Sequence, residues 1–173
     1  MRAKNLIVIM IFSMVLLNSC SSMAENRIDV KINPDSLITK IVGDTVADVL
    51  FSPKSVTLYL SENRKKENDK EVEIADGFVR DTLVAKLKAE DVSILQFVLL
   101  SDTLNYAIDS VQIKSPYMPF YEFVFIKKKE NVQVLISLSN NYWEIKHNNE
   151  TVCKYNFACK SQLERFLTLL FNL

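Results

Sequence analysis

The chain is poor in the residue types on which most recognisable catalytic and nucleotide-binding motifs depend. Its 173 residues include two glycines, one histidine and three cysteines. Two glycines are too few for the glycine-rich loops that cradle phosphates. A histidine-based metal site or a catalytic triad would depend on His147, and no partner residue follows it at a recognisable spacing. The sequence therefore predicts no cofactor and no metal site, and favours an exposed His147 at the end of a hairpin.

The chain also lacks an excess of either charge, with 21 basic and 21 acidic residues. A balanced charge gives no overall field that would attract nucleic acid. Two basic clusters, at 64–66 and 127–129, are each followed by glutamate and fall where turns are expected. We interpret both clusters as solvated loop tips and expect no nucleic-acid partner.

The first 20 residues have the pattern of an export signal. A basic start at 1–4 precedes an apolar stretch at 6–17, which is short for a permanent membrane-spanning helix. The stretch ends in Leu17-Asn18-Ser19-Cys20, which resembles the lipobox of bacterial lipoproteins. The resemblance implies that the chain is cut before Cys20 and that Cys20 is acylated, for example by palmitate. Two or three acyl chains would anchor the protein stably to a membrane.

The residues after Cys20 bear on its destination. Ser21-Ser22-Met23-Ala24-Glu25 contains no Asp at the second position and no acidic run. By resemblance, the first absence argues against retention in the inner membrane, and the second argues against the acidic surface-export tag of Bacteroidota lipoproteins. We expect an outer-membrane lipoprotein that faces the periplasm. The expected organisation is a signal peptide at 1–19, a flexible tether at 20–33 and a single domain at 34–173.

The mature chain predicts an α+β domain with an antiparallel sheet of about four to five strands, packed by two to three helices that include a C-terminal helix. Strands are expected at 55–60, 120–127, 132–138, 142–146 and 151–157, of which the last four form a C-terminal meander. Residues 61–70 read as a charged loop, and 46–51 as a short helix or an extended lead-in. Asp81 looks like the N-cap of a helix with Leu83, Val84 and Leu87 at helical spacing. Asp91 would cap a helix over 92–100, where a buried strand is the alternative. Ser161-Gln162-Leu163-Glu164 matches a capping box that opens the last helix.

Cys153 and Cys159 remain as thiols in a compartment that permits disulfides. In one continuous strand their Cα atoms would lie roughly 20 Å apart, too far for a bond. A turn near Asn156 would bring them together, so a Cys153–Cys159 disulfide stays open. No base for a nucleophilic cysteine is apparent.

Carboxylates and aromatic residues supply the other candidate site residues. Glu122 and Glu144 lie in separate expected strands and would meet across the sheet, most simply as paired surface charges. Five aromatic residues either line a ligand groove or pack in the core, and core packing is favoured: Tyr117, Phe120, Tyr121, Tyr142 and Trp143.

Asp followed by Ser or Thr and an aliphatic residue occurs five times, where about half a match is expected by chance. The triplet resembles the O-glycosylation acceptor of exported Bacteroidota proteins. It also suits turns and helix starts, because the side chains bond nearby backbone amides. The hydroxyls that would carry sugar belong to Ser36, Thr45, Thr82, Thr103 and Ser110.

The segment 114–125, followed by an apolar strand and a cysteine before a terminal helix, resembles small lipoproteins of Bacteroidota and implies no activity. The favoured hypothesis is a membrane-anchored, non-catalytic envelope protein that binds a protein or glycan partner. One alternative is a periplasmic enzyme with a dispersed site built from His147, Glu122 and Glu144. The other is an inhibitor or immunity-type protein, which predicts an exposed apolar or single-sign patch.

Overall fold

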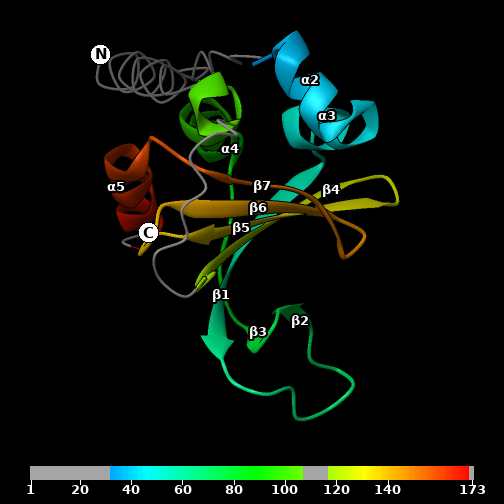
Figure 1. Ribbon diagram of the computed structural model, residues 1–173, viewed down its shortest axis with the longest axis vertical. Helices are drawn as coiled ribbons and strands as arrows, with labels where there is room; N and C mark the ends of the chain where they lie inside the picture. The colour runs from blue at the N-terminus through cyan, green and yellow to red at the C-terminus, as the bar shows by residue number, and fades with distance from the viewer. Residues whose placement is uncertain (1–31, 107–116, 172–173) are drawn as a thin grey trace, which may run out of the picture.

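The computed structural model describes residues 32–106 and 117–171 and consists of one curled antiparallel sheet with helices on one of its faces (Figure 1). The seven strands follow the spatial order β2-β3-β1-β4-β5-β6-β7. They are β1 (Ser55–Asn63), β2 (Glu73–Ala75), β3 (Phe78–Lys86), β4 (Tyr121–Lys127), β5 (Glu130–Ser137), β6 (Tyr142–His147) and β7 (Glu150–Asn156). The predicted α+β class is confirmed, as is the C-terminal meander β4–β7.

The helices are α2 (Ser36–Val42), α3 (Asp44–Phe51), α4 (Ala89–Leu95) and α5 (Lys160–Phe171). The π-helix η2 (Gln96–Leu100) continues α4, and the 3-10 helix η3 (Thr103–Tyr106) follows it. In α2 the Asp35 carboxylate accepts a hydrogen bond of 2.6 Å from the Leu37 amide, which caps the helix. Gly43 separates α2 from α3 with a φ of 84°, a conformation that favours glycine.

The count of four to five strands is wrong, because the described chain has seven. The error lies at 81–88, where a helix was expected and β3 is found instead. The spacing of Leu83, Val84 and Leu87 is helical, but β3 pairs with β1 through two register shifts. These shifts disturb the alternation of buried and exposed residues that would have revealed a strand. Strand β2 has three residues, too few to give a periodic signal.

The count of two to three helices is also too low, because the described chain has four α-helices and α2 was not predicted. The remaining differences concern boundaries. The charged segment after residue 60 begins as strand, since β1 runs to Asn63. The helix expected at 92–100 is present but begins at Ala89, so Asp91 lies inside its first turn, where its carboxylate accepts from the Lys88 amide at 3.1 Å. Helix α5 begins at Lys160, so Ser161 is inside the helix and is not the N-cap that the capping box required. The tether expected at 20–33 lies mostly outside the described residues.

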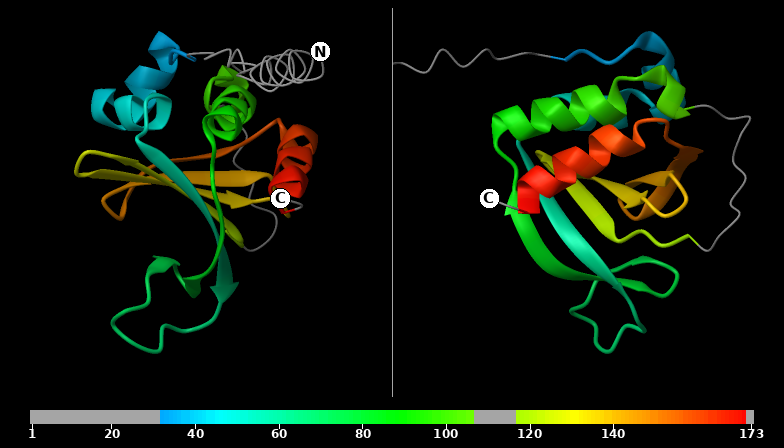
Figure 2. Two further views of the ribbon diagram at one scale, coloured as in Figure 1. Left: turned by 180° about the vertical axis from the view of Figure 1, so that it is seen from behind. Right: turned by 90° about the vertical axis from the view of Figure 1, so that its left-hand side faces the viewer.

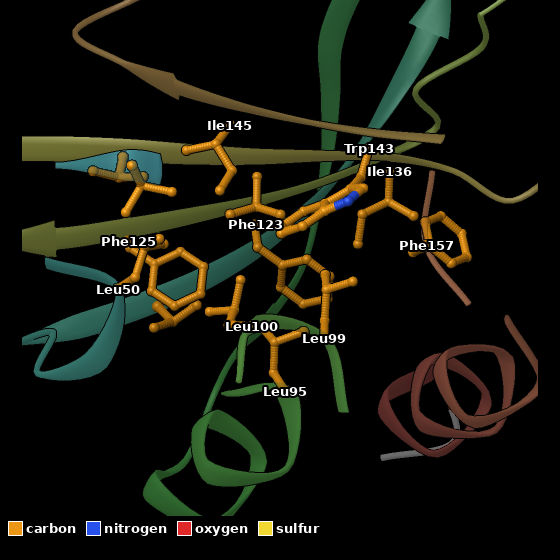
Figure 3. Close-up of a cluster of buried hydrophobic side chains, with 14 of the residues drawn as sticks. Leu50, Leu95, Leu99, Leu100, Phe123, Phe125, Ile136, Trp143, Ile145 and Phe157 are labelled. Atoms are coloured by element: carbon orange, nitrogen blue, oxygen red, sulfur yellow. The ribbon is translucent and has the colours of Figure 1, made fainter. Parts of the chain in front are cut away.

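The main core fills the space between one sheet face and the helices (Figure 3). Phe123, Phe125 and Trp143 point from the sheet toward Leu50 of α3 and Leu99 of η2, and all five are at most 1% exposed. Helices α4 and α5 lie side by side over this face (Figure 2). This face of the sheet is therefore fully occupied by packing.

Buried hydrogen bonds join η3 to the sheet and to the segment before α5, and join η2 to α3. The Trp143 indole donates to the Asn105 carbonyl at 2.8 Å, and the Asn105 side chain accepts from the Ala158 amide at 2.8 Å. Gln96, at the start of η2, donates to the Leu50 carbonyl at 2.8 Å. These bonds fix the helical layer on the core face.

Candidate ligand-binding site

The opposite face of the sheet carries a continuous row of paired residues, most of which have charged or aromatic side chains. The register aligns Tyr59, Glu122, Leu135, Glu144 and Lys154 on five adjacent strands, β1-β4-β5-β6-β7. Directly paired residues of antiparallel strands project from the same face. This polar face, defined by the row, is the side of the sheet that the helices do not cover (Figure 2).

Glu122 and Glu144 lie on this face as predicted, but the expectation of paired surface charges is wrong because both are buried. Glu122 is 0% exposed and Glu144 is 2% exposed. With β5 between them, their strands are two spacings apart, or about 10 Å. Leu135 lies between the two glutamates and packs with Ile74 and Phe78 from the β2–β3 hairpin. The hairpin thus folds over part of the polar face, which explains the burial.

Glu122 is committed to a structural ion pair. Arg80 donates to both of its carboxylate oxygens, from Nε at 2.6 Å and from Nη2 at 2.5 Å. Gln133 donates to Oε1 at 2.9 Å, and the Arg80 guanidinium lies 4.6 Å from the centre of the Tyr59 ring. A bidentate arginine with a stacked aromatic ring holds the carboxylate firmly and leaves it little capacity for a reaction.

Glu144 lies beside a cavity of about 360 Å³ that is lined by Ala75, Asp76, Tyr117, Glu144, Lys146, Thr151 and Lys154. Five of these residues have polar side chains from strands β6 and β7 or from the β2–β3 turn. A volume of this size falls in the range of small-molecule sites. The β2–β3 turn depends on Gly77, whose φ is 69°.

The carboxylate of Glu144 receives hydrogen bonds from one wall of the cavity. Thr151 donates its hydroxyl to Oε1, and the Lys154 ammonium lies 3.4 Å from the same oxygen. Lys154 also lies 6.0 Å from the centre of the Tyr117 ring. The charge of Glu144 is thus balanced within the wall, by a lysine that remains 45% exposed.

Two donors of the cavity have capacity for a ligand. The Lys146 ammonium donates to the Ile74 carbonyl at 2.5 Å, and within the described chain it pairs with no carboxylate. The Tyr117 hydroxyl is buried, and it interacts with the Glu144 carboxylate without making a hydrogen bond of normal geometry to any described residue. Burial and the negative charge of Glu144 raise the pKa of Tyr117 well above its usual range, so the hydroxyl keeps its proton and remains a donor.

The aromatic residues divide between packing and this site. Trp143 and Tyr142 are buried, Tyr121 packs edge-on against Phe171, and Phe120 packs edge-on against Phe78. Tyr117 lines the cavity and meets Tyr142 edge-on, with ring centres 4.9 Å apart. The preference for packing therefore holds for most of the group, and Tyr117 is the exception.

The structure does not bring together the three residues of the dispersed enzyme site. His147 pairs with Val132 and shares its face of the sheet, the core face, whereas Glu122 and Glu144 project from the other. The His147 ring lies 2.6 Å from Glu130 at the hairpin end, with the side chain 24% exposed. In the described chain no group of three metal-ligating side chains is close enough to hold a metal ion.

Both described cysteines are buried and free, so the disulfide that the sequence left open is not formed in the structure. Burial raises the pKa of Cys153 to about 12 and that of Cys159 to about 11. At neutral pH each thiol therefore stays protonated, which is the unreactive form.

The hydroxyls of the repeated triplet are exposed wherever the structure describes them, at Ser36, Thr45, Thr82 and Thr103. Ser110 lies outside the described residues, and so does Cys20. Asp35 and Asp102 accept hydrogen bonds from backbone amides two residues ahead, at 2.6 and 2.9 Å. Two of the four described triplets therefore serve as helix starts, whereas Asp81-Thr82-Leu83 lies within β3 and starts no helix. Exposure keeps the glycosylation hypothesis open.

No family model, curated protein or solved structure matches this chain. Among the described helices, none is long and apolar enough to cross a membrane. Sequence reasoning named Glu144 and Tyr117 but missed Lys146, Lys154 and the β2–β3 turn. The signal for the lysines was the alternation of β6 and β7, which places Glu144 and Lys146 on one face.

Proposed function

We propose that this protein is a lipid-anchored binding module of the bacterial cell envelope, attached through Cys20 and facing the periplasm. The lipobox supports the anchor. The cavity on the polar face is its binding site, and the ligand is a sugar unit that carries a carboxylate, presented by an envelope glycan. The activity is binding without catalysis.

The observation that carries this proposal is that the Lys146 ammonium and the Tyr117 hydroxyl line one cavity and both retain donor capacity. An ammonium and a protonated hydroxyl together favour an anionic oxygen. Lys146 uses one of its three donors on the Ile74 carbonyl, and a ligand oxygen that accepts from Tyr117 would give this buried hydroxyl a hydrogen bond of normal geometry.

The carboxylates in the wall narrow the ligand class. Glu144 and Asp76 are acceptors and suit the hydroxyl groups of a sugar, which a simple inorganic anion cannot offer. The Tyr117 ring offers an apolar surface for a sugar face, and about 360 Å³ accommodates one sugar unit.

Affinity capture of envelope material on the lipidated protein tests the proposal. We expect carboxylated glycan to be retained by the wild type and lost from the Tyr117→Phe/Lys146→Met variant. Lys160→Met is the matched control, because it removes a lysine that is 40% exposed on α5, away from the cavity. Equal retention by all three proteins would refute the assigned site. Equal retention by a Cys20→Ala protein would show that tethering is not needed for binding.

A further inference from the structure

Helices α2 and α4 lie at the end of the molecule opposite the β2–β3 hairpin (Figure 1). The helical layer exposes a group of large apolar side chains. We call this group the apolar helical surface. Its members are Leu37, Ile94, Phe97 and Leu104, which are 50%, 43%, 71% and 66% exposed. An exposed apolar group of this kind marks a contact with a partner or with a membrane.

The four residues come from neighbouring elements. Ile94 and Phe97 are three residues apart where α4 passes into η2, and such a spacing places two side chains on one helix face. Helix η3, which carries Leu104, contacts both η2 and α2, and α2 carries Leu37. The apolar helical surface is therefore contributed by one connected layer of helices.

The charges near this surface do not favour an anionic partner. Glu90 and Asp91 lie in the first turn of α4, and Asp102 precedes Leu104. A surface of this composition would bind by burying its apolar groups, without polybasic attraction to acidic lipids.

The place where the described chain begins indicates which partner contacts the apolar helical surface. Ile32 lines two adjoining cavities, one against α3 and the other between α3 and α4, so the chain enters the domain at the helical layer. Cys20 precedes Ile32 by 12 residues, a segment that spans at most about 40 Å. A lipid on Cys20 would therefore hold the helical layer close to the bilayer, at a high effective concentration.

We propose that the apolar helical surface docks into the interfacial region of the bilayer to which the chain is anchored. This inference rests on the proposed lipid anchor. Phe97 and Leu104 insert among the headgroups, and weak apolar contacts suffice because the anchor keeps them near. Docking in this way turns the β2–β3 hairpin, and with it the ligand cavity, away from the membrane (Figure 1).

The test measures membrane depth on the full lipidated protein in vesicles of phosphatidylethanolamine and phosphatidylglycerol. A nitroxide is attached at Leu104→Cys or, as the control, at Leu83→Cys, which replaces a leucine that is 58% exposed on β3 and pairs with Tyr59 of the polar face. The buried thiols of Cys153 and Cys159 react slowly and do not interfere. We expect the label at 104 to become accessible to oxygen and protected from a nickel chelate, while the label at 83 stays in water.

A second variant distinguishes docking through the apolar helical surface from nonspecific adsorption of the protein to the vesicles. Phe97→Asp, combined with the label at 104, returns that label to water, with a loss of docking of roughly tenfold or more as expected for one buried phenylalanine. Labels at 104 and 83 that behave alike would overturn the inference, as would a label at 104 that stays in water and is protected only by a protein partner. Flotation of the wild type against Cys20→Ala reports separately on the anchor, so a failed anchor is distinguished from failed docking.

Discussion

Removing the Arg80 guanidinium tests whether the polar face is held by a buried ion pair. The Arg80→Leu substitution leaves the Glu122 carboxylate, which is 0% exposed, with the single donor Gln133. Losing one partner of a buried pair costs about 3–5 kcal/mol, because the remaining charge is desolvated and uncompensated. Arg80 retains 20% exposure, so we expect a loss near the lower end, about 3 kcal/mol in the free energy of unfolding. For a domain of marginal stability this is a large fraction of the total.

Urea denaturation at pH 7 measures the loss, and two variants control it. Arg64→Leu removes an arginine of similar exposure, but its partners Glu62 and Glu71 are 58% and 18% exposed and stay in contact with water, so we expect a smaller loss than in Arg80→Leu. The double variant Arg80→Leu/Glu122→Leu removes both charges and should recover most of the stability lost in Arg80→Leu. A loss in Arg80→Leu no greater than that in Arg64→Leu would refute the reasoning.

Four further predictions concern other parts of the chain. Burial raises the pKa of Cys153 to about 12 and that of Cys159 to about 11, so both thiols should resist iodoacetamide at pH 8 in the folded protein. Both should react after unfolding, even when no reductant is added. A protein mass lower by two hydrogens, with no labelling of the unfolded protein, would show a disulfide. The same raised values mean that the folded state retains these protons longer, so stability falls as the pH rises from about 9 toward 11; a stability that rises over this interval would contradict the assignment. Gly43→Ala should cost about 1–3 kcal/mol in urea denaturation, because φ is 84° while no atom lies within 4 Å of the added methyl, so the penalty is one of backbone conformation; an unchanged midpoint would refute it. Mass spectrometry of the protein from its native host should show sugar on at least one of Ser36, Thr45, Thr82 and Thr103. Replacing the modified residue by alanine should remove the added mass, and an unmodified mature mass would refute the glycosylation hypothesis.

The part of the fold that was predictable from sequence is the part with regular local signals. Strands β4–β7 alternate clearly, and the Asn148-Asn149 turn adopts the positive φ values of 50° and 69° that such hairpins use. Strand β3 was not predicted because its bulges break the alternation of buried and exposed residues. Its place in the sheet depends on pairing with β1, a long-range contact that no local pattern records.

The candidate site was only partly predictable for the same reason. Glu122 and Glu144 were identifiable as members of separate strands, yet their burial depends on the β2–β3 hairpin that folds over Leu135. Tyr117 carried no periodic signal, because it lies before β4 in an irregular segment. The site therefore emerges from tertiary packing of three distant segments, and single residue types or spacings do not reveal it.

The central claim is that the cavity beside Glu144 binds a carboxylated sugar through Lys146 and Tyr117. Titration of the full mature protein with glucuronate and with glucose, followed by calorimetry and by chemical shifts of the cavity residues, tests it most directly. We expect glucuronate to bind at the cavity more tightly than glucose. The affinity for glucuronate should fall roughly tenfold in Lys146→Met and stay unchanged in Lys160→Met. Equal affinity for both sugars, or shifts confined to residues outside the cavity, would contradict the account.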